Sequence, residues 1–105
     1  MKLWVDNVRP ASLDYHWARS VDDAKFAIRI REQICATLLP NSKIIEVIDI
    51  GHNAGDYESE GGHYIKLLEW LEETGRNYPI HIHSDNQINL LWMREIIERN
   101  GWKEV

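Results

Sequence analysis

The amino-acid sequence predicts an α/β fold with a parallel sheet, and three observations support this prediction. Short apolar segments that are typical of buried strands alternate with longer segments whose apolar residues recur at helical intervals. Single strands joined by helical crossovers favour a parallel sheet with right-handed connections. Polar residues suited to catalysis follow several apolar segments, at the carboxyl ends where open α/β sheets bind their ligands.

Composition limits the functions that this fold could serve. The 105 residues, 44% of them hydrophobic, predict one globular domain over residues 1–105. A net charge of −5 disfavours binding to an extended nucleic-acid duplex but allows a small phosphorylated ligand held by an arginine. No apolar segment approaches the ~20 residues that span a bilayer, so we expect a cytoplasmic protein without membrane contact. The single Cys35 predicts a buried thiol, and the five tryptophans are expected to pack the core.

The first expected strand ends in polar residues. Leu3 to Val5 is a short apolar run, and Asp6 and Asn7 favour a turn directly after it. Arg9 follows within the same turn region. A strand that presents a carboxylate and then a guanidinium at its carboxyl end predicts one wall of a ligand site. The alternative is that Asp6 only caps a turn and Arg9 lies in solvent.

Three elements are expected in the next part of the chain. Residues 15–19 alternate in polarity and predict a short edge strand. Ser20 has the position of a helix N-cap, and the apolar spacing predicts a helix that continues to Leu39. Residues 43–50 are rich in β-branched side chains and predict a strand, with Asp49 at its carboxyl end.

The second half of the chain repeats this alternation. Residues 51–62 are rich in glycine and acidic residues and predict a long mobile loop, a segment type in which function concentrates. An amphipathic helix is expected over residues 63–73, a strand over 79–84 and a final helix over 88–99. Residues 102–105 could add a fifth strand or fray.

The convergence of three strand ends predicts a site. Asp6 and Asp49 on neighbouring strand ends repel each other unless a cation lies between them, and Mg²⁺ prefers such oxygen ligands. We therefore expect both to be metal ligands, with the alternative that one of them caps a loop. His81 and His83 share a strand face and give a weaker signal for zinc, because a zinc site needs further ligands.

Phosphate chemistry is the second expectation for the same strand ends. His83 could act as an acid or base near neutral pH, Ser84 could donate a hydrogen bond to a phosphoryl oxygen, and Arg9 could pair with the same group. The alternative role for Ser84 is a helix N-cap, for which Asn86 competes.

The chain resembles the cyclic-phosphate processing receiver domains, a divergent branch of the response-regulator receiver fold. The resemblance depends on residues 3–10 and 17–24, and on Ile82-His83-Ser84 with Asn86 and Met93-Arg94. It implies an α/β fold, as a three-layer α/β/α sandwich that is receiver (flavodoxin)-like, with a central parallel sheet of four to five strands. It also implies a site at the strand carboxyl ends that processes or binds cyclic phosphates, with RNA 2′,3′-cyclic phosphate ends among the expected ligands.

The resemblance assigns roles to individual residues, and the sequence departs from the family at some of them. Asp6 matches the first acid of an opening acidic pair, whereas Asn7 replaces the second acid. Asp49 matches the first Asp of a motif that reads approximately Leu-Asp-His-Asp-Leu-Gly in relatives, and Ile50 and Gly51 replace its His and second Asp. A bulge could let His52-Asn53 restore part of that chemistry.

Arg9, His83, Ser84 and Asn86 match the family. Arg9, His83 and Ser84 are expected to act in catalysis, and Asn86, with the substituted Asn7, to contact the bound ligand or cofactor. Two functions follow. The first is a metal-dependent phosphoesterase, with a divalent metal, expected to be Mg²⁺, on Asp6 and Asp49. The second is a catalytically degenerate receiver-like module that binds or signals without turnover, because the replaced acids weaken the metal site.

Overall fold

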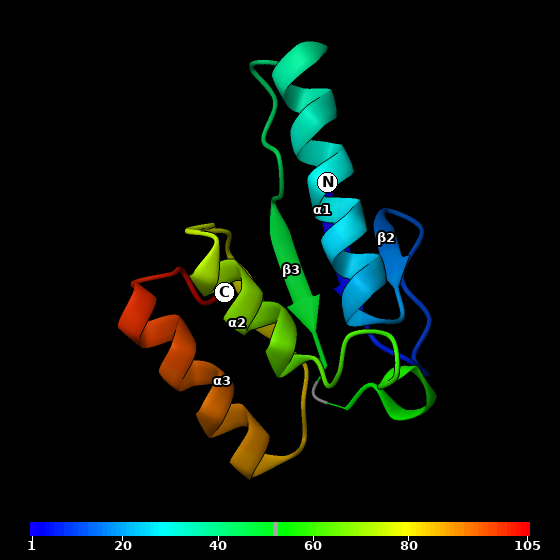
Figure 1. The fold of residues 1–105 in the computed structure, drawn as a ribbon, viewed down its shortest axis with the longest axis vertical. Helices are drawn as coiled ribbons and strands as arrows, with labels where there is room; N and C mark the ends of the chain where they lie inside the picture. The colour runs from blue at the N-terminus through cyan, green and yellow to red at the C-terminus, as the bar shows by residue number, and fades with distance from the viewer. Residues whose placement is uncertain (52) are drawn as a thin grey trace.

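A computed structural model of the protein describes residues 1–51 and 53–105, and these residues form a parallel sheet with three helices (Figure 1). The strands have the order β2-β1-β3-β4, and every neighbouring pair is parallel. Their bounds are β1 Lys2–Val5, β2 Tyr15–Ala18, β3 Val47–Ile50 and β4 Ile80–Ile82. The helices are α1 Val21–Thr37, α2 Ile65–Glu73 and α3 Gln87–Asn100, and a 3-10 turn, η1, covers Gly55–Tyr57.

The receiver-like α/β fold, the parallel sheet and the edge position of β2 are confirmed. The strand expected over residues 43–50 begins later, at Val47, because Val47 is paired with Lys2, the first residue of β1, so residues 43–46 extend beyond that strand. Residues 102–105 contribute a single parallel bridge between Glu104 and Ile80 rather than a strand. The expected loop over 51–62 contains η1.

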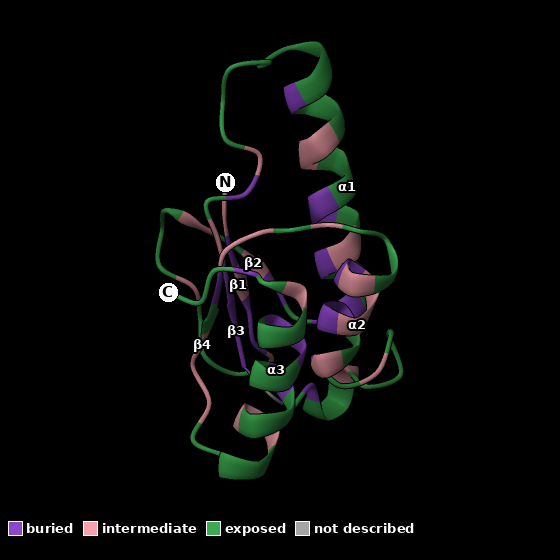
Figure 2. Cartoon of the chain, turned by 90° about the vertical axis from the view of Figure 1, so that its left-hand side faces the viewer, coloured by how far each residue is buried: buried purple, intermediate pink, exposed green. Residues whose placement is uncertain are grey.

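One face of the sheet packs against all three helices. The register aligns Leu3 with Ile48 and Val5 with Ile50, and these side chains are fully buried in one core cluster. The core also contains residues from each helix, namely Ala24, Ala27 and Ile28 of α1, Leu67, Leu68 and Leu71 of α2, and Met93, Ile96 and Ile97 of α3. Figure 2 shows the three helices on one side of the strands.

The opposite face, here called the open face, carries Trp4, Trp17, Asp49 and His81, because side chains alternate along a strand. No helix of the described residues covers it, since residues 6–14 connect β1 to β2 without a helix. The second helical layer that a three-layer sandwich requires is therefore not formed by the described residues. The side chains of the open face are consequently positioned to build a site.

The expectation that the tryptophans pack the core is wrong for most of them. Only Trp102 is buried, Trp4, Trp17 and Trp70 are half-buried, and Trp92 is 56% exposed. The expected burial of the Cys35 thiol, in contrast, is confirmed. Within the described part of the chain, no helix has both the length and the apolar composition needed to cross a membrane.

Candidate functional site

A cleft lies at the carboxyl ends of β1, β3 and β4, where the sequence predicts a site. Its volume is about 330 Å³, at the lower end of the roughly 300–1,000 Å³ of small-molecule sites. The lining residues come from the segments that follow the three strands: Asp6, Asn7, Val8, Arg9, Gly51, Asn53, Gly55, His83, Ser84 and Asp85.

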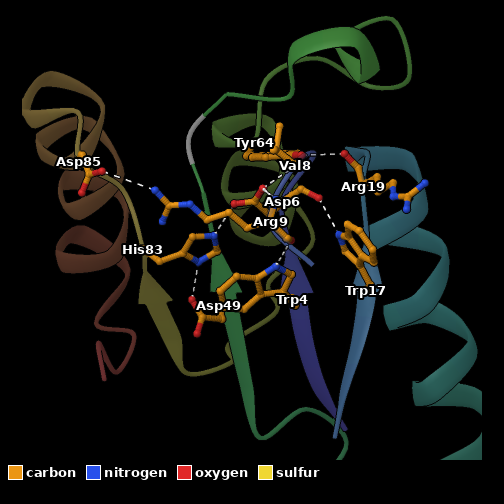
Figure 3. A network of polar contacts seen from close by, with 10 residues as sticks. All are labelled: Trp4, Asp6, Val8, Arg9, Trp17, Arg19, Asp49, Tyr64, His83 and Asp85. Atoms are coloured by element: carbon orange, nitrogen blue, oxygen red, sulfur yellow. Dashed lines mark hydrogen bonds and ion pairs between the residues drawn. The ribbon is translucent and has the colours of Figure 1, made fainter. Parts of the chain in front are cut away.

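The imidazole of His83 bridges the two carboxylates that the sequence places together (Figure 3). Its Nδ1 lies 2.5 Å from Oδ1 of Asp49, and its Nε2 lies 2.8 Å from Oδ2 of Asp6. The three side chains are only 11–12% exposed. A carboxylate oxygen only accepts hydrogen bonds, so both ring nitrogens donate when both acids are ionised, and the ring is an imidazolium.

Asp6 is held by the turn that follows β1. Its Oδ1 accepts hydrogen bonds from the backbone N–H groups of Val8 and Arg9, each at 2.8 Å. Aspartate favours such a turn because its side chain can accept hydrogen bonds from the backbone N–H groups that follow it. The Trp17 indole N–H donates to the backbone carbonyl of Asp6 at 2.8 Å. Burial alone would raise the pKa of Asp6, but the hydrogen bonds from Arg9, Val8 and His83 outweigh it and lower the pKa.

Trp4 fixes the plane of the His83 ring. The two rings are stacked, with centroids 4.1 Å apart and planes 4° apart, and the Trp4 indole N–H donates to the carbonyl of Arg9 at 2.8 Å. An aromatic face favours a cation above it, so this contact stabilises the imidazolium. Burial alone would lower the pKa of His83, but the hydrogen bonds to Asp49 and Asp6 outweigh it and raise the pKa.

Gly51 leaves the space in which His83 meets Asp6. A Cβ atom at Gly51 would lie 3.2 Å from Oδ2 of Asp6 and 3.3 Å from Nε2 of His83. Both distances are shorter than ordinary van der Waals contacts, so a larger side chain would press on this hydrogen bond. The glycine that replaces an acid of the family motif is therefore compatible with a histidine between the two carboxylates.

The other residues that the sequence predicts for the site have separate places. Arg9 lines the cleft, and its Nη2 lies 3.5 Å from Oδ2 of Asp85. Asn7 also lines the cleft and packs closely against Gly55. Ser84 lines the cleft and accepts a hydrogen bond from the backbone N–H of Asn86 at 3.2 Å. Asn86 is the N-cap of α3 and lies outside this cleft, on a neighbouring one.

The donor groups do not fit the Mg²⁺ ion that the sequence predicts on Asp6 and Asp49 while His83 lies between them. Each carboxylate has an oxygen bound to His83, and the second oxygen of Asp6 accepts two N–H groups. Among the described residues, no group of three or more His, Cys, Asp or Glu side chains could hold a metal ion. His81, considered for zinc, places its Nδ1 2.6 Å from the carbonyl of Val105. The metal site stays a prediction.

Some contributors to the site were not identified from the sequence. The sequence places Trp4 and Trp17 in the core, whereas Trp4 contacts His83 and the carbonyl of Arg9, and Trp17 contacts the carbonyl of Asp6. Tyr64 is buried, its hydroxyl donates to the carbonyl of Arg19 at 2.7 Å, and its pKa is raised by burial and by the charge of Asp6. His52, proposed to restore part of the motif, lies outside the described residues.

Comparison with known proteins supports the resemblance. A family model described as the cyclic-phosphate processing receiver domain matches residues 1–99, which include the strand ends and the whole cleft. Neither the curated proteins nor the solved structures gave a significant match.

Proposed function

The chain belongs to the cyclic-phosphate processing receiver domain family, and on that basis we propose that it binds a cyclic phosphate in the cleft and opens the phosphate ring by hydrolysis. The observation that supports this most is the position of His83, held between Asp6 and Asp49 at the edge of a cleft that also contains Arg9. The cleft is lined by a proton donor on His83, a proton acceptor on Asp6 and the guanidinium of Arg9, which are groups suited to phosphodiester hydrolysis.

The proposed reaction conserves atoms and protons. Water attacks phosphorus, a P–O bond of the ring breaks, and the product is a phosphomonoester with a free hydroxyl group. Asp6 Oδ2 accepts a proton from the water, and His83 Nε2 donates its proton to the leaving oxygen. The proton on Asp6 then returns to Nε2 across the 2.8 Å hydrogen bond. Asp49, on Nδ1, orients the ring and keeps it protonated.

Arg9 is the proposed anion-binding group. The His83 ring and its two carboxylates together carry one net negative charge, so the phosphate needs another cation. Arg9 is the arginine of the cleft lining, and its side chain is 60% exposed. Its contact with Asp85 is long, at 3.5 Å, and Asp85 is 95% exposed. Exposed pairs of this kind contribute little stability, so a phosphate can displace Asp85 from Arg9.

Turnover of nucleoside 2′,3′-cyclic phosphates, followed by ³¹P NMR, tests this proposal. The substitution His83→Gln removes the ionisable ring but keeps an amide donor between the carboxylates. We expect it to lower kcat by about 10²- to 10⁴-fold, the usual contribution of a positioned acid–base group. His81→Ala is the matched control, because His81 lies two residues away on the same strand face and outside the cleft. Equal rates for the wild type and His83→Gln contradict the proposed role.

A module that binds the cyclic phosphate without turnover is the second candidate. One observation favours it: both ring nitrogens of His83 are already engaged by carboxylates, which stabilises the charged ring and opposes release of its proton. Calorimetric binding to the wild type with no product in the ³¹P spectrum would establish this alternative. Absence of binding across a panel of cyclic phosphates excludes both candidates.

Substitution of His83 also tests the predicted Mg²⁺ site. In the wild type the imidazolium competes with any cation for Asp6 and Asp49. We expect Mg²⁺ to bind His83→Ala more tightly than the wild type, because the two carboxylates then face each other without a positive charge between them. Titration calorimetry measures the Kd of Mg²⁺ for both proteins. Tighter binding to the wild type would instead show that His83 is compatible with a resident metal.

A further inference from the structure

A second cleft adjoins the first. Its volume is about 320 Å³, and Asn53 lines both clefts. Its other lining residues are His63 and Ile65, before and at the start of α2, and Asn86, Asn89 and Trp92, on the first turns of α3. A ligand whose phosphate lies beside Arg9 and His83 could therefore extend past Asn53 into this second cleft.

Trp92 is the feature of the second cleft that needs an explanation. Its side chain is 56% exposed on α3. Trp4, Trp17 and Trp70 each contact another ring or a cation, whereas no ring or cation contact is found for Trp92 within the described residues. An exposed tryptophan at the wall of a cleft provides a flat aromatic surface that a ligand ring can cover.

Most polar side chains around Trp92 are amides, and the exception is His63, whose Nε2 lies 3.3 Å from Oε1 of Glu58. The Asn86 side chain uses Oδ1 to cap α3 by accepting the N–H of Asn89 at 3.0 Å. Its Nδ2 has no partner among the described residues, and no hydrogen bond within that part of the chain engages the Asn89 side chain. Amides both donate and accept hydrogen bonds, as the edges of nucleobases do. Bases in single-stranded or free nucleotides are recognised by such combinations of aromatic stacking and edge contacts.

We propose that the second cleft binds the nucleobase of the cyclic phosphate, stacked on Trp92 with its edge at Asn86 and Asn89. This inference depends on the proposed function, because the phosphate in the first cleft brings the base to the second. It identifies the ligand as a nucleoside cyclic phosphate rather than a cyclic phosphate without a base.

A pair of ligands that differ only in the base tests this inference. Adenosine 2′,3′-cyclic phosphate and 1-O-methylribose 2′,3′-cyclic phosphate share the charged ring, and titration calorimetry gives the Kd of each. We expect the adenosine ligand to bind wild type roughly tenfold more tightly or better, as typical base stacking provides. Trp92→Ala should remove this difference and leave the Kd of the methylribose ligand unchanged, and Trp92→Phe should retain part of it. Leu91→Ala, at an exposed neighbouring position outside the cleft, should change neither.

Each possible outcome is informative. Equal affinity of the wild type for the two ligands overturns the base site and leaves the proposed function standing. A Trp92→Ala variant that weakens both ligands equally also overturns it, because the effect is then not specific to the base. Failure of both ligands to bind the wild type overturns the proposed function, and with it this inference.

Discussion

Two clusters of ionisable side chains are largely withdrawn from solvent, and they differ in what they do. The His83 network comprises His83, Asp6 and Asp49 at the strand ends. The Glu32 network comprises Glu32 of α1 with Arg76 and Tyr78, which lie between α2 and β4. Arg76 donates two hydrogen bonds to the Glu32 carboxylate, each at 2.8 Å, and the Tyr78 hydroxyl donates a third.

The difference between the networks is one of titration and access. The Arg76 hydrogen bonds lower the pKa of Glu32, and the Glu32 hydrogen bond raises the pKa of Arg76, so this pair stays charged around neutral pH. None of its members lines the cleft, and the network connects α1 to the segment before β4. The His83 network has a titratable ring at its centre and a cleft beside it. Ionisable side chains thus stabilise the fold in the Glu32 network and are suited to proton transfer in the His83 network.

Among substitutions outside the two networks, those that disturb the space around the His83 network should have the largest effect on activity. In Gly51→Ala the new methyl group would press against Asp6 Oδ2 and His83 Nε2. We expect a decrease in kcat of about 10- to 100-fold, since displacement of a catalytic group by a fraction of an ångström to 1 Å has effects of this order. Steady-state turnover of the cyclic phosphate measures it.

Gly75→Ala is the matched control for Gly51→Ala. Gly75 has a φ of 69°, and nothing lies within 4 Å of the position that an alanine methyl group would take, so the substitution strains the backbone without touching the site. It should reduce the free energy of unfolding by about 1 kcal/mol and leave kcat unchanged. If both substitutions lower kcat equally, Gly51 has no specific role at the His83 network.

Breaking the Glu32 network should have the opposite effect to Gly51→Ala: it should lower stability and leave kcat unchanged. Arg76→Ala removes two hydrogen bonds and leaves Glu32 with the Tyr78 hydroxyl alone. We expect the free energy of unfolding to fall by roughly 1–2 kcal/mol, less than for a fully buried pair because both side chains keep about a fifth of their exposure. The corresponding fall in Tm is roughly 5–10 °C by calorimetry. An unchanged Tm, or a loss of kcat at temperatures where the variant is folded, would contradict this separation of roles.

The sequence predicts the elements and the meeting of the strand ends, because both follow from local patterns. Apolar periodicity identifies the strands and the α-helices to within a few residues, although it misses η1. Parallel strands must present their carboxyl ends at one edge. Asp6, Asp49 and His83 could therefore be placed together from the sequence. Arg9 and Ser84 were also expected at these strand ends, and both line the cleft.

The contacts within the site could not be predicted, because they depend on distances between segments far apart in the chain. Two acids at one edge indicate a cation, but a sequence does not show whether that cation is Mg²⁺ or an imidazolium. Here Gly51 leaves space for the His83 ring between the two acids and the Trp4 ring stacks on it, and neither contact can be derived from the sequence. The prediction that the tryptophans pack the core is wrong for Trp4 and Trp17, because the open face of the sheet on which they lie is a tertiary feature.

Removing Asp85, the acid that neighbours Arg9, should strengthen ligand binding in the cleft beside the His83 network. Asp85→Asn removes the negative charge 3.5 Å from the guanidinium, and we expect the Kd for the cyclic phosphate to fall about two- to threefold, as for other exposed pairs. Asp14→Asn, which makes the same charge change beside Lys2 and away from the cleft, should leave the Kd unchanged. The gain should disappear at about 1 M salt, because exposed charges are then screened. An equal gain in both variants would indicate only the overall charge.

The smallest expected effect is the pH dependence of stability. As pH rises above 6.5, the His83 network should lose stabilisation and the Glu32 network should not. The pKa of His83 is raised above its ordinary value of 6.5, so its contribution is complete below that pH and is lost as pH rises through the raised pKa. The pKa of Asp6 is lowered from 3.8, so its contribution is complete above that pH and is lost as pH falls through the lowered pKa. Both contributions are therefore complete between pH 3.8 and 6.5.

Urea unfolding at a series of pH values measures this window. The free energy of unfolding should decline as pH rises above 6.5 in wild type, in which the Glu32 pair stays charged. The same decline is expected in Arg76→Ala, because that substitution leaves His83 and its two acids unchanged. His83→Gln should abolish that decline, because the amide has no proton to lose. The effect is small because the cost of burying the ring offsets part of the stabilisation by the two carboxylates. A decline that persists in His83→Gln would assign it to another group and remove the support for an imidazolium between Asp6 and Asp49.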